Sequence, residues 1–164
     1  MSHDAPVLEV YRAPMRSRDD SVVHAAAVAW ALQWGVVGVG GVVGEAPDGP
    51  DDAVDRVRAE HGDRLADRLR RFIDVEISSF AWTRTEEVGF RLGRIHGPWA
   101  YDASPSAAEV ALPHTRACRW IDTEVSPSDV PADVLATFER GGRNFQRVRS
   151  ESAERATLEL WERS

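Results

Sequence analysis

Lysine is missing from the sequence, so all 20 of its Lys and Arg positions are arginines. A Schiff-base enzyme and a P-loop NTPase each need a lysine, and common nucleases use one beside their acidic metal ligands. The sequence also lacks the H-E-x-x-H and paired C-x-x-C metal-binding spacings, and the G-x-S-x-G elbow that presents a catalytic serine. We therefore predict no catalytic residue, no metal site and no cofactor. A hydrolase of unfamiliar design that acts on nucleotides is left open as an alternative.

Cysteine and long apolar runs are also scarce. Cys118 is alone and cannot form an internal disulfide, and the sequence shows neither a charged-then-apolar leader nor an apolar run of about 18 residues. These absences predict a cytoplasmic protein without a membrane segment. A net charge of −7 argues against loose coating of nucleic acid or of an anionic membrane, but it is compatible with a local basic groove. The length of 164 residues and the 43% hydrophobic content fit a single domain over residues 1–164.

Hydrophobic periodicity predicts short strands together with amphipathic helices. Because the strands cluster in the second half, we predict an α+β fold, a small, mixed, mainly antiparallel β-barrel with helices packed outside. We expect strands at 7–11, 35–43, 80–84, 88–96, 114–123 and 144–149, with a hairpin loop at 85–87, a turn at Gly97-Pro98 and a loop over 104–113. We expect helices at 22–34, at 50–73 with a break at Gly62-Asp63, near 129–138, and at 151–162 within a C-terminal segment 150–164.

The glycine run within 35–44 is the first candidate for a binding motif. Gly38, Gly40 and Gly44 miss the G-x-G-x-x-G spacing of a dinucleotide site, and the Ala-Pro-Asp-Gly-Pro segment that follows offers no helix N-terminus to a phosphate. We therefore interpret the run as a core strand on which another element packs very closely.

Aromatic residues and arginines concentrate between Phe80 and Arg149. Trp82 and Arg84 lie two apart, so they share one face of a strand, and Arg116 and Trp120 share a face in the same way. Such a face can stack a flat ring while arginine contacts a phosphate or a base edge. Burial in the core is the alternative for the two tryptophans. Trp99 and Tyr101 lie beside the expected turn, where an aromatic side chain is less easily buried, and are better candidates for a ligand site.

The order of these segments resembles the PUA-like, EVE-type superfamily, and in particular the N-terminal domain of some Mrr-like restriction endonucleases. The matching pieces run across most of the chain. They are Val10-Tyr11-Arg12, the segment from Ala29 to Gly41 with Gly38-Val39-Gly40, Trp82-Thr83-Arg84, the segment from Leu92 to Tyr101, the segment from His114 to Trp120, and Val125 to Pro131. Gly41 stands where that group has a tryptophan, and Ser78-Ser79 stands where it has Gly-Asp.

The resemblance implies a bent small barrel whose pocket receives a nucleobase, often a modified one, flipped out of its strand and held by aromatic walls. On that hypothesis Trp34, at the other end of the glycine-rich strand, replaces the wall that is missing at Gly41. Trp82, Trp99 and Tyr101 are the expected pocket walls, and Arg84, Arg94, His114 and Arg116 are expected to contact phosphate or the base edge.

We therefore predict a non-catalytic nucleic-acid-binding module. The resemblance implies that it reads a modified or flipped base in DNA and serves a separate effector, a restriction nuclease or a helicase. A protein-interaction or small-molecule sensor domain is the first alternative. The net acidity and the terminal helix carrying Leu160 and Trp161 favour it. The sequence leaves the oligomeric state open.

Overall fold

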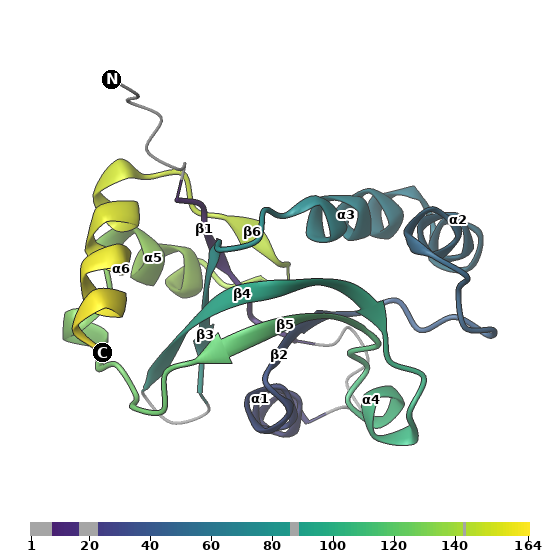
Figure 1. Ribbon diagram of the computed structural model, residues 1–164, viewed down its shortest axis with the longest axis horizontal. Coiled ribbons are helices and arrows are strands. Elements are labelled where there is room, and N and C mark those ends of the chain that lie inside the picture. The colour runs from purple at the N-terminus through teal and green to yellow at the C-terminus, as the bar shows by residue number, and fades with distance from the viewer. Residues whose placement is uncertain (1–7, 17–22, 86–88, 143) are drawn as a thin grey trace.

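The computed structural model describes residues 8–16, 23–85, 89–142 and 144–164 (Figure 1). The first residue of the strand predicted at 7–11, the first residue of the helix predicted at 22–34, and most of the hairpin loop predicted at 85–87 lie outside these ranges. The elements, in chain order, are β1 (Val10–Arg12), α1 (His24–Trp34), β2 (Val36–Val39), α2 (Pro50–His61), α3 (Asp63–Asp74), β3 (Phe80–Arg84), β4 (Phe90–Tyr101), α4 (Pro105–Glu109), β5 (His114–Trp120), η1 (Pro127–Asp129), α5 (Ala132–Glu139), β6 (Gln146–Arg147) and α6 (Glu151–Arg163).

The strands form one mixed sheet in the order β2-β5-β4-β3-β1-β6. Neighbouring strands run antiparallel, except that β1 and β3 run parallel. The sheet curls into a half-barrel in which β4 and β5 arch between the helices (Figure 1). The predicted α+β class and its mainly antiparallel sheet with outside helices are therefore confirmed.

Two cores lie on opposite faces of this sheet, because successive strand residues point to opposite sides. The first, which we call the α3 core, contains Ala81 and Ile95 with the buried residues of α1, α2 and α3. The second, the α6 core, contains Phe80 and Trp82 with buried residues of α5 and α6. Figure 1 shows α5 and α6 at one end of the molecule and α2 and α3 at the other. The assignment of each strand residue to one of these cores decides which side chains a ligand can reach.

The helices α2 and α3 follow the predicted pattern closely. On α3 the buried Ala66, Leu69 and Phe72 recur every three residues among charged neighbours, which places them on one helical face. Gly62 separates the two helices at the predicted break, with a φ of 97°. That left-handed region suits glycine and lets the chain reverse direction between the helices.

Two predicted connections are structured differently. The predicted turn at Gly97-Pro98 lies inside β4, at a register shift between Ile95 and Trp99. A Cβ at Gly97 would lie 2.9 Å from the Cβ of Ala117, so close strand contact explains this glycine. The predicted loop over 104–113 contains the short helix α4, where the Ser104 hydroxyl accepts a 3.2 Å hydrogen bond from the Ala107 amide. Among the helices of the described ranges, none has the length and apolar character needed to cross a membrane.

Candidate functional site

A cavity of about 320 Å³ lies between the two edges of the curled sheet. One wall is the end of β2 and the glycines after it, and the opposite wall comes from the segments after β1 and before β6. Its volume falls at the lower end of the range of about 300–1,000 Å³ that is common for ligand pockets. The lining residues are Met15, Arg16, Gly38, Val39, Gly40, Gly41, Val42, His61, Leu65, Arg68, Leu69, Ala111, Leu112, Asn144 and Phe145.

The β2 wall presents backbone groups at the outer edge of the sheet. The Cys118 amide donates to the Gly35 carbonyl at 2.8 Å, which fixes the alternation along the β2–β5 pair. In an antiparallel pair every second residue then faces away from its partner strand, so the N–H and C=O of Gly38 face the outer edge. Because β2 is an end strand of the sheet, no strand among the described residues pairs with them on that side. Gly38 packs closely, as predicted, since a Cβ there would lie 3.1 Å from the Leu112 Cβ.

His114 holds the glycine wall from behind. The Trp99 indole donates to its Nδ1 at 3.1 Å, so Nε2 carries the proton and donates to the Gly41 carbonyl at 2.8 Å. Tyr101 meets the imidazole edge-on at 5.1 Å, and its hydroxyl accepts a 3.2 Å bond from the Val43 amide. Burial, with a smaller contribution from the charge of His61, lowers the pKa of His114 to about 4. His114 is therefore a neutral support of the wall.

Arg116 fixes helix α3, which forms part of the cavity wall. Its buried guanidinium donates to the carbonyls of Phe72 and Val75, both at 2.9 Å, and of Ile73 at 3.2 Å, at the end of α3. Its Nε donates to the Gly97 carbonyl at 2.6 Å, at the irregularity of β4. A cation at the carboxyl end of a helix also complements the helix dipole. Arg116 thus clamps α3, and with it the cavity wall formed by α3, onto the sheet.

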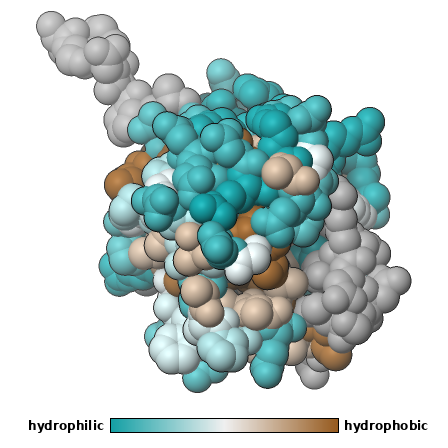
Figure 2. Space-filling model, turned by 90° about the vertical axis from the view of Figure 1, so that its right-hand side faces the viewer, coloured by the Kyte–Doolittle hydropathy of each residue, from teal (hydrophilic) through white to brown (hydrophobic). Residues whose placement is uncertain are grey.

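The cavity itself combines apolar walls, one aromatic ring and cations. Phe145 stacks on Tyr11 at a centroid distance of 4.8 Å and meets Phe72 edge-on at 5.1 Å, so its ring is held in place. Exposed Arg16 and half-buried Arg68 also line the cavity. Among the described lining residues none is acidic, although the chain as a whole carries a charge of −7. Figure 2 looks onto the α2 end of the molecule and shows apolar atoms exposed below a hydrophilic upper part.

Comparisons with known proteins bear on the fold alone. No protein-family model matches the chain, and no curated protein matches it in sequence. Among solved structures, the chain is similar to a YTH domain of the Zygosaccharomyces rouxii MRB1 protein, determined in complex with N6-methyladenosine RNA. The match has a TM-score of 0.50 at 10% identity and covers 99% of this chain and 92% of the other. The two chains share a fold. The PUA-like, EVE-type resemblance stays a prediction.

The predicted cleft of Trp82, Trp99 and Tyr101 does not form. Trp82 has no exposed surface and lies in the α6 core, where its indole donates to the Thr157 hydroxyl at 3.1 Å. Trp99 and Tyr101 pack against the α3 core, on the other face of the sheet. They come together around His114, but behind the cavity wall and not as its surface. The expected contacts of His114 and Arg116 with a ligand are corrected in the same way, because both side chains are buried and bonded to the protein.

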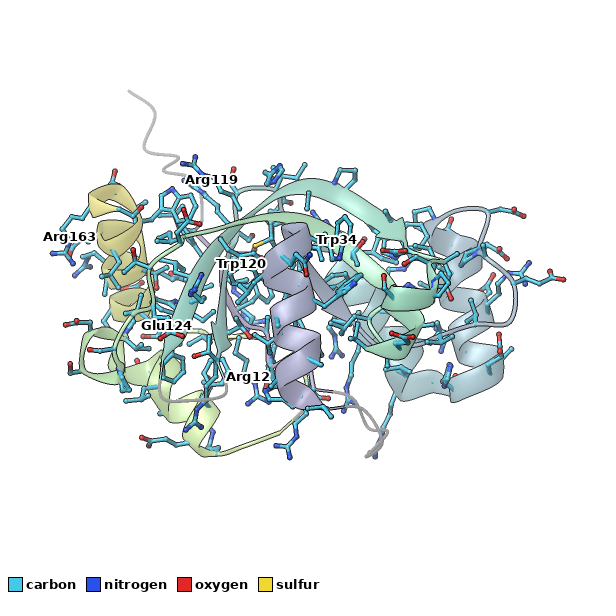
Figure 3. All side chains as sticks on the ribbon, turned by 90° about the horizontal axis from the view of Figure 1, so that it is seen from below. Arg12, Trp34, Arg119, Trp120, Glu124 and Arg163 are labelled. Carbon is cyan, nitrogen blue, oxygen red and sulfur yellow. The ribbon has the colours of Figure 1, made fainter. Side chains whose placement is uncertain are left out.

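The remaining candidates lie away from the cavity. The guanidinium of exposed Arg84 lies 5.9 Å from the Phe90 ring. The guanidinium of Arg94 lies 4.6 Å from the Phe80 ring, and its Nε donates to the Ser78 carbonyl at 2.9 Å. Trp34 is 62% exposed at the end of α1 and does not line the cavity, so it does not replace the missing wall (Figure 3). Within the described ranges, no group of three histidine, cysteine or acidic side chains could hold a metal ion.

Sequence reasoning missed the residues that do line the cavity. Phe145 is a single aromatic in a short polar segment, and nothing in its local pattern distinguishes it. Arg68 lies between Leu65 and Leu69 at helical spacing, which marks it as a cation beside an apolar stripe. That signal could have been found in the sequence, because an arginine next to an apolar stripe lies at the border of the core and not in the middle of a solvated helix face.

Proposed function

We propose that this chain is a non-catalytic nucleic-acid-binding module that takes one nucleobase into the cavity between β2 and α3. The observation that carries the proposal is the cavity itself. It brings the outer-edge N–H and C=O of Gly38 together with a fixed aromatic ring and two arginines. None of the described residues that line it is acidic. The fold shared with a YTH domain that was solved with N6-methyladenosine RNA supports the same class of ligand.

The chemistry of the cavity suits a flat heteroaromatic ring. Leu65 and Leu69 offer an apolar wall from α3, and Phe145 offers a ring against which a base can stack. The N–H and C=O of Gly38 provide one donor and one acceptor side by side, which matches the edge of a base that has left its stack. Arg16 and Arg68 provide donors for the phosphate or the base edge.

The resemblance to the N-terminal domain of some Mrr-like restriction endonucleases makes the proposed ligand and partner more specific. The base is a modified one, it belongs to DNA, and a separate nuclease or helicase is the effector. Arg84 and Arg94 remain proposed contacts for more distant phosphates, because neither lines the cavity. Fluorescence anisotropy with short single strands and duplexes of DNA and RNA, with and without N6-methyladenine or 5-methylcytosine, tests this more specific proposal. We expect the tightest binding to one of the modified DNA probes.

The cavity can be blocked without disturbing the backbone. A Cβ on Gly40 would meet only the Ala111 carbonyl at 3.7 Å, an ordinary contact, so alanine fits at this position. Because Gly40 lines the cavity, we expect the branched end of a leucine at this position to occupy part of it. We expect Gly40→Leu to weaken nucleic-acid binding at least about tenfold, the loss that removal of one stacked base produces.

Gly40→Ala is the matched control and is expected to bind within about twofold of the wild type, because a single methyl group leaves most of the cavity open. Equal binding by the leucine and alanine variants, with both folded by circular dichroism, would contradict the base-binding role of this cavity. Tight binding of free nucleosides, with no preference for a strand, would favour the small-molecule sensor instead.

A further inference from the structure

The charges of α3 are divided between its two flanks. On the flank toward α2, Arg70 pairs with Asp51 at 2.6 Å, and Asp67 pairs with Arg58 at 3.3 Å. The other flank carries Arg64, Arg68 and Arg71 at spacings of four and three residues, which places them in one stripe along the helix. We call these three residues the arginine stripe. The helix therefore pairs Arg70 on one side and presents Arg64 and Arg71 as exposed side chains on the other.

The arginine stripe runs beside the cavity. Arg68 lines the cavity together with Leu65 and Leu69, and Arg64 and Arg71 lie about one turn before and after it. Arg64 and Arg71 are exposed, and neither forms an ion pair with any residue of the described ranges. Arg64 lies in the first turn, where the helix dipole disfavours a cation. Arg71 lies in the last turn, where the dipole favours a cation, so helix stability gives a reason for Arg71 but not for Arg64.

We propose that the arginine stripe contacts the phosphates on either side of the base that enters the cavity, so that a single strand of nucleic acid lies along α3. This inference rests on the proposed function. From Arg64 to Arg71 the helix rises about 10 Å, which matches two or three phosphates of one strand. The guanidinium fork suits phosphate oxygens, which it meets with two parallel hydrogen bonds.

The surroundings of the stripe favour a strand over a flat anionic surface. The adjacent helix α2 carries Asp51, Asp52 and Asp55. A membrane surface that approached α3 would also meet these carboxylates and be repelled. A narrow flexible strand can follow the stripe and avoid them. The partner is therefore a single-stranded or locally opened nucleic acid.

The salt dependence of binding separates this role from a general charge effect. The probes are short mixed-sequence single strands of DNA and RNA labelled with fluorescein, titrated over a series of salt concentrations. The double variant Arg64→Gln with Arg71→Gln removes two phosphate contacts, so we expect the slope of log affinity against log salt to become shallower by about 1.4. The affinity at low salt is expected to fall about tenfold, for every sequence alike. Arg68 is kept, because it also lines the cavity.

The matched control is Arg155→Gln with Arg163→Gln, on exposed positions of α6. It changes the net charge equally, and Arg163 points outward at the end of the molecule opposite α3 (Figure 3). We expect the control to keep the wild-type slope. If the slope for Arg64→Gln with Arg71→Gln equals that of the control, the arginine stripe does not contact the phosphates. Gly40→Leu tests the cavity separately, since it is expected to lose affinity with its slope unchanged, and normal binding by Gly40→Leu overturns the base pocket alone.

Discussion

Replacing Arg116 by methionine is expected to lower the free energy of unfolding by about 4 kcal/mol. Arg116 is 2% exposed, and its guanidinium donates to four backbone carbonyls, three at the end of α3 and one at Gly97 of β4. Methionine fills similar space but donates nothing, so these carbonyls lose their partners in a place where water has little access. The loss falls on the contact that holds α3, and we expect hydrogen exchange to speed up first near Phe72 and Ile73.

Urea unfolding followed by tryptophan fluorescence measures this loss. The matched control is Arg119→Met on the same strand, where the guanidinium is exposed and lies 5.7 Å from the Trp161 ring. A cation over an aromatic ring at such a site contributes about 0.5–1 kcal/mol, so the control is expected to lose no more than that. Equal losses for the two variants would show that Arg116 does not clamp α3.

The elements with regular periodicity could be predicted from the sequence. The helices α2 and α3, with their break at Gly62, match the prediction because their apolar residues recur at helical spacing and a single glycine interrupts them. The turn at Gly97-Pro98 was wrong for a physical reason. Local turn chemistry favours a reversal there, but pairing with β5 resumes after the register shift, and an irregular strand tolerates a proline that cannot donate to the ladder.

The site was harder to predict, because periodicity says which side chains share a face and not what covers that face. Trp82 and Arg84 do lie two apart on β3, but the α6 core encloses the tryptophan and leaves the arginine exposed. Burial of Arg116 also depends on α3, which is more than 40 residues away in sequence. The glycine run was interpreted as a closely packed strand. That is correct at Gly38, while the same lack of side chains opens the cavity at Gly40.

The two buried polar side chains, Arg116 and His114, support the cavity by binding backbone carbonyl groups. Arg116 holds the carbonyls at the end of α3, and His114 holds the carbonyl of Gly41. The sequence cannot distinguish such a support from a ligand contact, since arginine and histidine serve both. The distinction lies in their partners. Main-chain oxygens accept from both side chains, and the Trp99 indole donates to the second nitrogen of His114, so the imidazole has no donor left for a ligand.

His114 gives the fold a pH dependence whose sign follows from its burial. Burial lowers the pKa of the folded-state imidazole from 6.5 to about 4. Between these values the unfolded chain takes up a proton that the folded chain excludes, so the stability present above pH 6.5 is lost as the pH falls toward 4. Between pH 7 and pH 5 we expect the free energy of unfolding to fall by about 2 kcal/mol through this one group.

His114→Gln is expected to remove that part of the pH dependence. Glutamine offers an amide donor to the Gly41 carbonyl and an acceptor to the Trp99 indole, and it does not titrate. His61, which approaches from α2 and donates to the Val42 carbonyl, is the charged neighbour that adds to the effect. Urea unfolding at both pH values measures the difference, with exposed His96→Gln as the matched control that keeps the wild-type response. If His114→Gln loses as much stability as the wild type between these pH values, the imidazole is not the neutral, buried support of the glycine wall.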